Sequence, residues 1–220
     1  MKKKVFKGVI FDLDGTLLDT IADIADAVNR TLLESGFNEH PLAAYHYYIG
    51  SGWRKLIYET LPKGTPEKIA EAVYKKSKTR YHDNLNKTTV PYSGITELLD
   101  YLAQQKIVVA VLTNKAHEPA VKCIKEILPD RTFAFIMGKG RDFNPKPDPE
   151  GALIISEKTG IPPKKFLFIG DSDVDMITAN AAGMFGVGAC WGYRDEVELK
   201  ESGSKVLAYH PKDVIKFLSC

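Results

Sequence analysis

Short apolar runs rich in β-branched and aromatic residues alternate along the chain with amphipathic helical patterns. The runs cover residues 9–11, with Val5 and Phe6 before them, and then residues 107–112, 133–137 and 166–169. Runs of this kind predict strands that are buried on both faces, and their alternation with helices is typical of a parallel sheet covered by helices. The pattern therefore predicts an α/β protein with an open parallel sheet.

Apolar residues at helical spacing fill the segments between the later strands. An amphipathic helix that leads into the strand at residue 107 is predicted by Ile95, Leu98, Leu99 and Leu102, which lie at i, i+3, i+4 and i+7. Further helices are expected near residues 118–127, 149–158 and 173–182, and Gly183 is a suitable end for the last of them.

The connection after the first strand is much longer than an ordinary loop, at about seventy residues. One helical face within it is formed by Ile21, Ile24, Ala25, Val28 and Leu32. We expect this helix to begin at Thr20, with Asp23 as its capping-box partner, and to end near Gly36. Further helices are expected around 53–61 and 66–84. Residues 19–89 are therefore predicted to form a small helical domain inserted into a core of residues 1–18 and 90–220.

Composition and charge narrow the class of protein. Of the 220 residues, 44% are apolar and 26% are charged, which excludes disordered, collagen-like and coiled-coil chains. The 30 Lys and Arg residues nearly balance the 28 Asp and Glu residues, and a net charge of +2 argues against a nucleic-acid or membrane partner. Partners must therefore be inferred from individual sites.

Cysteine use and the N-terminal segment favour a cytoplasmic location. The thiols of Cys123, Cys190 and Cys220 are expected to be reduced, because their spacings are long and no CxxC or Cys/His motif accompanies them. Lys7 and Asp12 interrupt the first apolar run, which therefore does not match a signal peptide. No later apolar run is long enough to span a bilayer.

Two carboxylates follow the first predicted strand in the sequence Phe11-Asp12-Leu13-Asp14-Gly15-Thr16. Residues two apart in an extended chain point to one face, and open parallel sheets bind ligands at the carboxyl ends of their strands. A turn would explain Asp and Gly, but it does not require two acids, a Gly and a Thr after a buried strand. We therefore interpret Asp12 and Asp14 as candidate functional residues.

A second acidic group, Gly170-Asp171-Ser172-Asp173-Val174-Asp175, follows the strand at 166–169. An adjacent strand would bring Asp171 and Asp175 to the edge of the sheet where Asp12 lies. Carboxylates that converge repel one another unless a cation neutralises them, and such hard oxygen ligands suit Mg²⁺. Asp173, in contrast, is expected to cap the following helix.

Candidate phosphate-binding groups follow two other segments. Thr113 and Asn114 end the strand at 107–112, where a hydroxyl and adjacent N–H groups suit a phosphoryl oxygen, although Thr and Asn also commonly cap helices. Lys146 lies in Asn144-Pro145-Lys146-Pro147-Asp148-Pro149, where the prolines fix the backbone and aim the lysine. We expect Thr113, Asn114 and Lys146 to bind a phosphoryl group.

These four elements, in this order and after these strands, resemble the haloacid dehalogenase-like superfamily, specifically its phosphatase branch. The resemblance implies a Rossmann-like, doubly wound parallel core with an inserted helical cap. It implies that Asp12 is the nucleophile and that Asp14 is the general acid and then the general base. It also implies Mg²⁺ on the Asp12 carboxylate, the Asp14 backbone carbonyl and the Asp171 carboxylate, with Asp175 in support.

The cap implied by the resemblance would close over the site and exclude water. Its segment Gly50-Ser51-Gly52-Trp53-Arg54-Lys55-Leu56-Ile57 resembles phosphoglycolate phosphatase-like members, as does Leu112-Thr113-Asn114-Lys115. Arg54 is the cap candidate for binding the distal part of the substrate, since a guanidinium holds a carboxylate or phosphate bidentately. The alternative for Arg54 is a solvated helix residue.

We therefore expect a Mg²⁺-dependent hydrolase of a small phosphomonoester, with phosphoglycolate as a candidate substrate, acting through an aspartyl-phosphate. The partner would be a small phosphorylated metabolite, and the protein a monomer or homodimer. The nearest alternative is a sugar phosphomutase resembling β-phosphoglucomutase, although Thr16 favours hydrolysis because similar mutases often carry Val there. A non-catalytic binding module is the other alternative; it would be expected to have lost Asp12, Asp14, Lys146 or Asp171.

Overall fold

A six-stranded parallel sheet forms the centre of the core in the computed structural model, which describes residues 6–140 and 142–218. In spatial order its strands are β5 (Phe135–Lys139), β4 (Val108–Ala116), β1 (Gly8–Phe11), β6 (Phe166–Gly170), β7 (Phe185–Ala189) and β8 (Val206–Ala208). From β1 the chain passes to β4 and then β5 on one side of the sheet. It then returns to the other side of β1 and forms β6, β7 and β8. The predicted α/β class is confirmed, and the carboxyl end of β1 lies at the point where such sheets bind ligands.

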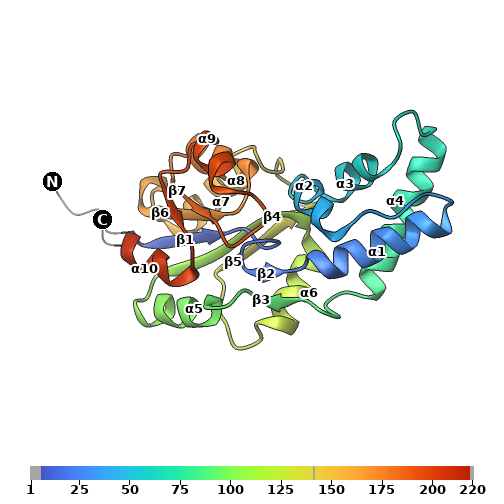
Figure 1. Cartoon of the computed structure of the whole chain (residues 1–220). Coiled ribbons are helices and arrows are strands. Elements are labelled where there is room, and N and C mark those ends of the chain that lie inside the picture. The colour runs from blue at the N-terminus through green and yellow to red at the C-terminus, as the bar shows by residue number, and fades with distance from the viewer. Residues whose placement is uncertain (1–5, 141, 219–220) are drawn as a thin grey trace.

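Helices cover both faces of this sheet (Figure 1). One face carries α5 (Ile95–Gln104), α6 (His117–Ile127) and α10 (Val214–Phe217), and the other carries α7 (Glu150–Thr159), α8 (Asp173–Ala181) and α9 (Glu196–Glu201). Alternate residues of β1 point to opposite faces: Val9 and Phe11 share an apolar cluster with Ile124 of α6, whereas Ile10 shares one with Ile155 of α7. The two-sided burial explains why this strand is apolar throughout.

The predicted strands differ from the observed ones at one edge of the sheet. The run at 133–137 was expected to be a strand, but β5 pairs with β4 only from Phe135 onward and continues to Lys139. β7 and β8 were not expected, because β7 contains two glycines and β8 has only three residues. Val5 and Cys220, which figured in the sequence predictions, lie outside the described residues.

The inserted segment forms a helical arm beside the sheet (Figure 1). Its helices are α1 (Ile21–Glu34), α2 (Tyr45–Tyr48), α3 (Trp53–Thr60) and α4 (Glu67–Asp83), with a short 3₁₀ helix at Leu42–Ala44. Two further 3₁₀ helices, Pro163–Lys165 and Pro211–Asp213, belong to the core. The arm is joined to the core by β2 (Leu18–Asp19) and β3 (Val90–Pro91), which pair antiparallel. This pairing supports our division into a core of 1–18 and 90–220 and a cap of 19–89, which remains a proposal. Within the described ranges, no helix is long and apolar enough to cross a membrane.

The expected capping box at the start of α1 is wrong. The hydroxyl of Thr20 donates to Asp14 at 2.8 Å instead of capping the helix. The carboxylate of Asp23 accepts hydrogen bonds from the N–H and hydroxyl groups of Thr88 and Thr89, at 2.7 to 3.1 Å. Asp23 therefore ties the entry of the arm to its exit, a long-range role that the local spacing did not indicate.

Replacing Asp23 with alanine is expected to lower the free energy of unfolding by about 2 kcal/mol, because the donors of buried Thr89 and of Thr88 lose a charged acceptor. Burial raises the pKa of Asp23, but these hydrogen bonds outweigh it and hold the pKa below its ordinary value. The stabilisation is therefore complete above the ordinary pKa of about 3.9 and is lost as the pH falls through the lowered value. Urea unfolding as a function of pH measures both effects.

Asp26→Ala is the matched control for Asp23→Ala. Asp26 lies on the same helix and pairs with exposed Arg30, so its removal should change the free energy of unfolding by no more than about 0.5 kcal/mol. Equal losses in the two variants would contradict the role assigned to Asp23.

Candidate active site

The polar residues singled out in the sequence come from separate segments that meet at the carboxyl edge of the sheet. Asp12 and Asp14 follow β1, whereas Asp171 follows β6 and Asp175 lies in the first turn of α8. Lys146 lies between β5 and α7. Because β1 is hydrogen-bonded to β6 in parallel, the ends of the two strands deliver their acids to one place.

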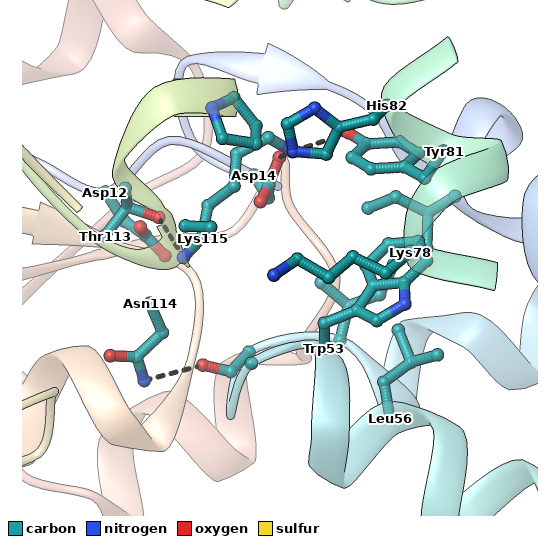
Figure 2. Close-up of a pocket in the computed structure, with 16 residues that line it drawn as sticks. Asp12, Asp14, Trp53, Leu56, Lys78, Tyr81, His82, Thr113, Asn114 and Lys115 are labelled. Carbon is teal, nitrogen blue, oxygen red and sulfur yellow. Dashed lines mark hydrogen bonds and ion pairs between the residues drawn. The ribbon is translucent and has the colours of Figure 1, made fainter. Parts of the chain in front are cut away.

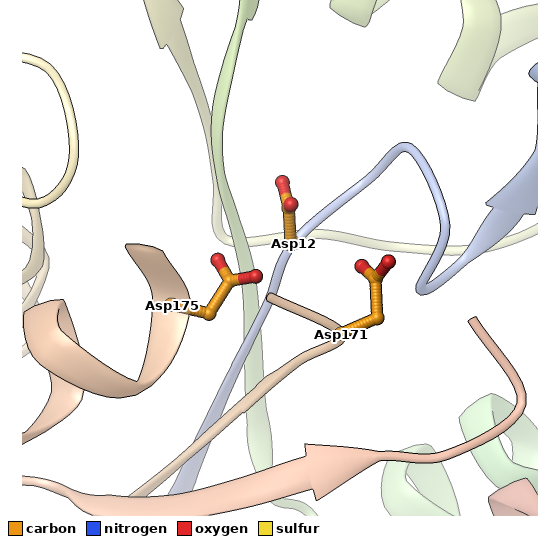
Figure 3. Close-up of side chains that lie close together, drawn as sticks. All are labelled: Asp12, Asp171 and Asp175. Carbon is orange, nitrogen blue, oxygen red and sulfur yellow. The ribbon is translucent and has the colours of Figure 1, made fainter. Parts of the chain in front are cut away.

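Asp12, Asp171 and Asp175 form a compact buried group (Figure 3). Each offers a carboxylate oxygen, and these oxygens all lie within 4.8 Å of one another. The amino group of Lys146 is 2.9 Å from Asp12 Oδ1 and 2.6 Å from Asp175 Oδ1, and its side chain is almost fully buried. One ammonium therefore contacts two of the three buried carboxylates, and the formal negative charge of the group exceeds its positive charge.

This imbalance of charge shifts the pKa values of the group. Burial raises the pKa of Asp12 to about 7; the charge of Lys146 opposes this rise and that of Asp175 adds to it. Burial, and then repulsion from Asp175 and Asp12, raises the pKa of Asp171 to about 8. Burial lowers the pKa of Lys146, but Asp12 and Asp175 outweigh it and hold the pKa above its ordinary value. The group lacks positive charge, and its oxygen donors fit a hard divalent cation.

Asp171 is fixed by residues of the first loop and of the segment after β7. Its Oδ1 accepts a hydrogen bond from Thr16 Oγ1 at 2.7 Å, and its Oδ2 accepts one from the N–H of Tyr193 at 2.9 Å. Gly15 has φ +84°, and a Cβ there would lie 2.3 Å from Asp171 Oδ2. The Gly and Thr of the first motif therefore position a carboxylate that is distant in the sequence, which the sequence analysis did not foresee.

Asp175 also begins helix α8. Its Oδ2 accepts hydrogen bonds from the N–H and the hydroxyl of Ser172, at 3.1 and 2.6 Å, and completes a capping box. Ser172, rather than Asp173, is thus the N-cap residue, and the expectation for Asp173 is wrong. The side chain of Asp175 is held between the helix terminus and Lys146.

The carboxylate of Asp14 lies outside the group of three acids. Its Oδ1 accepts hydrogen bonds from Lys115 Nζ and Thr20 Oγ1, both at 2.8 Å, and Thr20 also contacts the hydroxyl of Tyr193 at 3.1 Å. Asp14 is therefore placed beside Asp12 with a charged partner of its own. The role of Lys115 was not anticipated.

Lys115 also connects the core with the cap. Its amino group donates to the hydroxyl of Tyr81 on α4 at 2.6 Å, and the Tyr81 ring stacks on Trp53 of α3 with centroids 4.6 Å apart. Burial lowers the pKa of Lys115, but interactions with Asp14, Tyr81 and Cys123 together outweigh it and hold the pKa above its ordinary value. A charged lysine thus joins the cap to Asp14.

Thr113 and Asn114 were expected to end the strand, but they lie within β4, which continues to Ala116, and their surroundings differ. Thr113 lines a cavity at the site, and its hydroxyl oxygen accepts a hydrogen bond from the N–H of Lys115 at 3.2 Å. Asn114 lines the same cavity, but its amino group donates to the carbonyls of Gly50 and Lys146, at 3.0 and 2.9 Å. Asn114 therefore joins the cap to the Lys146 loop, and its donors are occupied.

The cavity lies between the core and the cap (Figure 2), and its volume is about 70 Å³. Its polar wall belongs to the core and includes Asp12, Asp14, Thr113, Asn114 and Lys115. Its other wall belongs to the cap and includes Ile24, Ile49, Trp53, Leu56, Lys78, Tyr81 and His82. A small polar molecule bound here would have its reacting group against the core and its remainder against the cap.

The structure places Arg54 away from this cavity. Its guanidinium is half-exposed, pairs with Glu71 at 2.6 Å and lies 4.7 Å from the centre of the Tyr74 ring. The expectation that Arg54 grips the substrate is therefore not supported by its position. Lys78 and His82 of α4 line the cavity instead. Buried Tyr81, which lies between them in the sequence, lines the same cavity and identifies the face of α4 that is turned toward it.

Comparison with known proteins agrees with this geometry. The family model for haloacid dehalogenase-like hydrolases matches residues 9–189. A phosphoglycolate phosphatase from Pseudomonas putida KT2440 is 33% identical over 190 residues, which cover 84% of this chain and 70% of the relative. One from Aquifex aeolicus is 33% identical over 210 residues and covers 96% of this chain and 95% of the relative.

Solved structures share the whole architecture. The crystal structure of a predicted phosphoglycolate phosphatase from Haemophilus somnus superimposes with a TM-score of 0.90 at 27% identity, and the match covers 96% of this chain and 97% of that one. With the family model spanning both strand-end acidic motifs, the chain belongs to the haloacid dehalogenase-like hydrolase family.

Proposed function

We propose that this protein is a Mg²⁺-dependent phosphatase that hydrolyses a small phosphomonoester through an aspartyl-phosphate on Asp12. The observation that carries the proposal is the position of Asp12, whose carboxylate lies at the wall of the cavity with Lys146 2.9 Å away. Phosphoglycolate is the first substrate to test, because the relatives bear its name. The cysteine pattern supports a cytoplasmic location for this activity.

Asp12 supplies the nucleophile. One of its carboxylate oxygens attacks phosphorus, the bond from phosphorus to the ester oxygen breaks, and the phosphoryl group passes to Asp12. The hydroxyl of Thr113 at the same wall and the ammonium of Lys146, 2.9 Å from Asp12, bind the phosphoryl oxygens. Asp12, Asp171 and Asp175 would hold Mg²⁺, which when bound supplies positive charge to the phosphoryl oxygens.

Asp14 moves the proton. In the first step it donates a proton to the departing alcohol oxygen, and in the second it accepts a proton from the water that attacks the aspartyl-phosphate. Phosphate then leaves and Asp12 is regenerated. Lys115 and Thr20 hold the Asp14 carboxylate in place for both transfers.

The proposal predicts that the protein releases inorganic phosphate from phosphoglycolate and from an aryl phosphate in the presence of Mg²⁺, which a phosphate-release assay measures. Steady-state kcat/KM over a panel of phosphorylated metabolites would rank the substrates. Absence of turnover across that panel, with Mg²⁺ shown to bind, would favour a non-catalytic binding module.

The sugar phosphomutase alternative has no specific observation in its favour. Thr16 donates its hydroxyl hydrogen to Asp171, and valine at this position would lose that bond. An isomerised sugar phosphate formed without release of inorganic phosphate would identify a mutase.

A further inference from the structure

Lys78 is a cation of the cap that lines the cavity. Figure 2 shows its side chain extending from α4 into the cavity, with the amino group directed toward the core wall. Within residues 6–140 and 142–218 it makes no hydrogen bond or ion pair, whereas neighbouring Lys75 and Lys76 pair with Glu71 and Glu34. The face of α4 toward the cavity therefore presents an unpaired positive charge.

Both carboxylates that line this cavity already contact a lysine. Asp14 pairs with Lys115, and Asp12 pairs with Lys146. Lys78 shares the cap wall with His82 and with the apolar residues Ile49, Trp53 and Leu56. An ammonium beside an apolar, partly enclosed wall attracts an anion more strongly than it would in bulk water.

The position of Lys78 relative to the reacting groups decides which part of the substrate it meets. The phosphoryl group would lie at the core wall beside Asp12, so the leaving group extends toward the cap. We propose that Lys78 binds a negative charge on the leaving group, so that the enzyme selects short phosphomonoesters whose alcohol carries a carboxylate. This inference rests on the proposed phosphatase function and assigns to Lys78 the role that the sequence analysis had expected of Arg54.

The test compares two esters of similar size, phosphoglycolate and 2-hydroxyethyl phosphate, whose leaving groups differ in a carboxylate. In Lys78→Gln the ratio of kcat/KM for phosphoglycolate to kcat/KM for 2-hydroxyethyl phosphate is expected to fall at least about tenfold, mainly through KM. Lys78→Arg should restore most of the ratio, since it returns a positive charge to the same place. Lys68→Gln makes the same change at an exposed lysine of α4 outside the cavity and should leave the ratio as in the wild type.

The outcomes separate this inference from the proposed function. If the wild type hydrolyses neither this pair of esters nor any other on the panel, the phosphatase function itself is wrong. If it hydrolyses both and Lys78→Gln keeps the wild-type ratio, or loses activity on both esters equally, Lys78 does not recognise the leaving group and only this inference fails.

Discussion

Replacing Asp12 with asparagine is expected to lower kcat for phosphomonoester hydrolysis by at least about 1000-fold, because the amide is a poor nucleophile toward phosphorus. The change is nearly isosteric, so KM and the fold should change little. Burial raises the pKa of Asp12 to about 7, which shows that its charge is costly here, and the neutral side chain should not destabilise the protein. Phosphate release measures kcat, and acid quenching with a radiolabelled substrate detects the covalent phosphoryl group.

The control for this variant is Asp130→Asn, which removes an exposed carboxylate between α6 and β5, at the opposite edge of the sheet. It should retain wild-type kcat. A labelled covalent intermediate that persists in Asp12→Asn would show that another residue accepts the phosphoryl group, and undiminished turnover would refute the mechanism.

Removal of divalent metal is expected to abolish turnover, and Mg²⁺ should stabilise the folded protein. Lys146 contacts two of the three clustered carboxylates, so a bound cation relieves their remaining repulsion in the native state alone. At a concentration 100 times its Kd, Mg²⁺ should raise Tm by about 5–10 °C. Thermal unfolding with and without EDTA measures this shift independently of activity.

The rise in Tm should shrink as the pH falls below about 7. Burial raises the pKa of Asp12 to about 7 and that of Asp171 to about 8, so protons compete with the cation for the same oxygens. Lowering the pH protonates both groups and weakens cation binding, whereas raising the pH strengthens it.

Substitutions at two acids that lie two residues apart provide the matched comparison for the metal prediction. Asp171→Asn should lose the Mg²⁺-dependent rise in Tm, whereas Asp173→Asn should keep it, because Asp173 lies outside the group of three carboxylates. An equal rise in both variants would place the cation elsewhere.

The sequence predicted those parts of the fold and the site that depend on local pattern. The buried strands β1 and β6 and the first part of β4, residues 108–112, are apolar runs, and polar residues come directly after each run. A parallel sheet then brings Asp12 and Asp171 together without further information. The weakest strands, β7 and β8, are glycine-rich or very short, and neighbouring strands and helices specify them more than their own residues do.

The parts that could not be predicted depend on partners distant in the sequence. The spacing of Thr20 and Asp23 matches a capping box. In the structure, however, Thr20 donates to Asp14, and Asp23 accepts hydrogen bonds from Thr88 and Thr89. No sequence motif indicates that Lys115 connects Asp14 to Tyr81. The orientation of a cap side chain depends on how the arm packs against the core, which is why the sequence could not indicate that Lys78 rather than Arg54 lines the cavity.

The pairing of β2 with β3 has a consequence for how such proteins diversify. Leu18 lies opposite Pro91 and Asp19 opposite Val90, so the arm leaves and rejoins the core at almost one point. The core therefore accommodates the arm as it would a hairpin loop, and the arm can be exchanged, shortened or redesigned without shifting the register of the main sheet. Because the acids lie on the core and Lys78 on the arm, the reaction and the choice of substrate can evolve as separate modules.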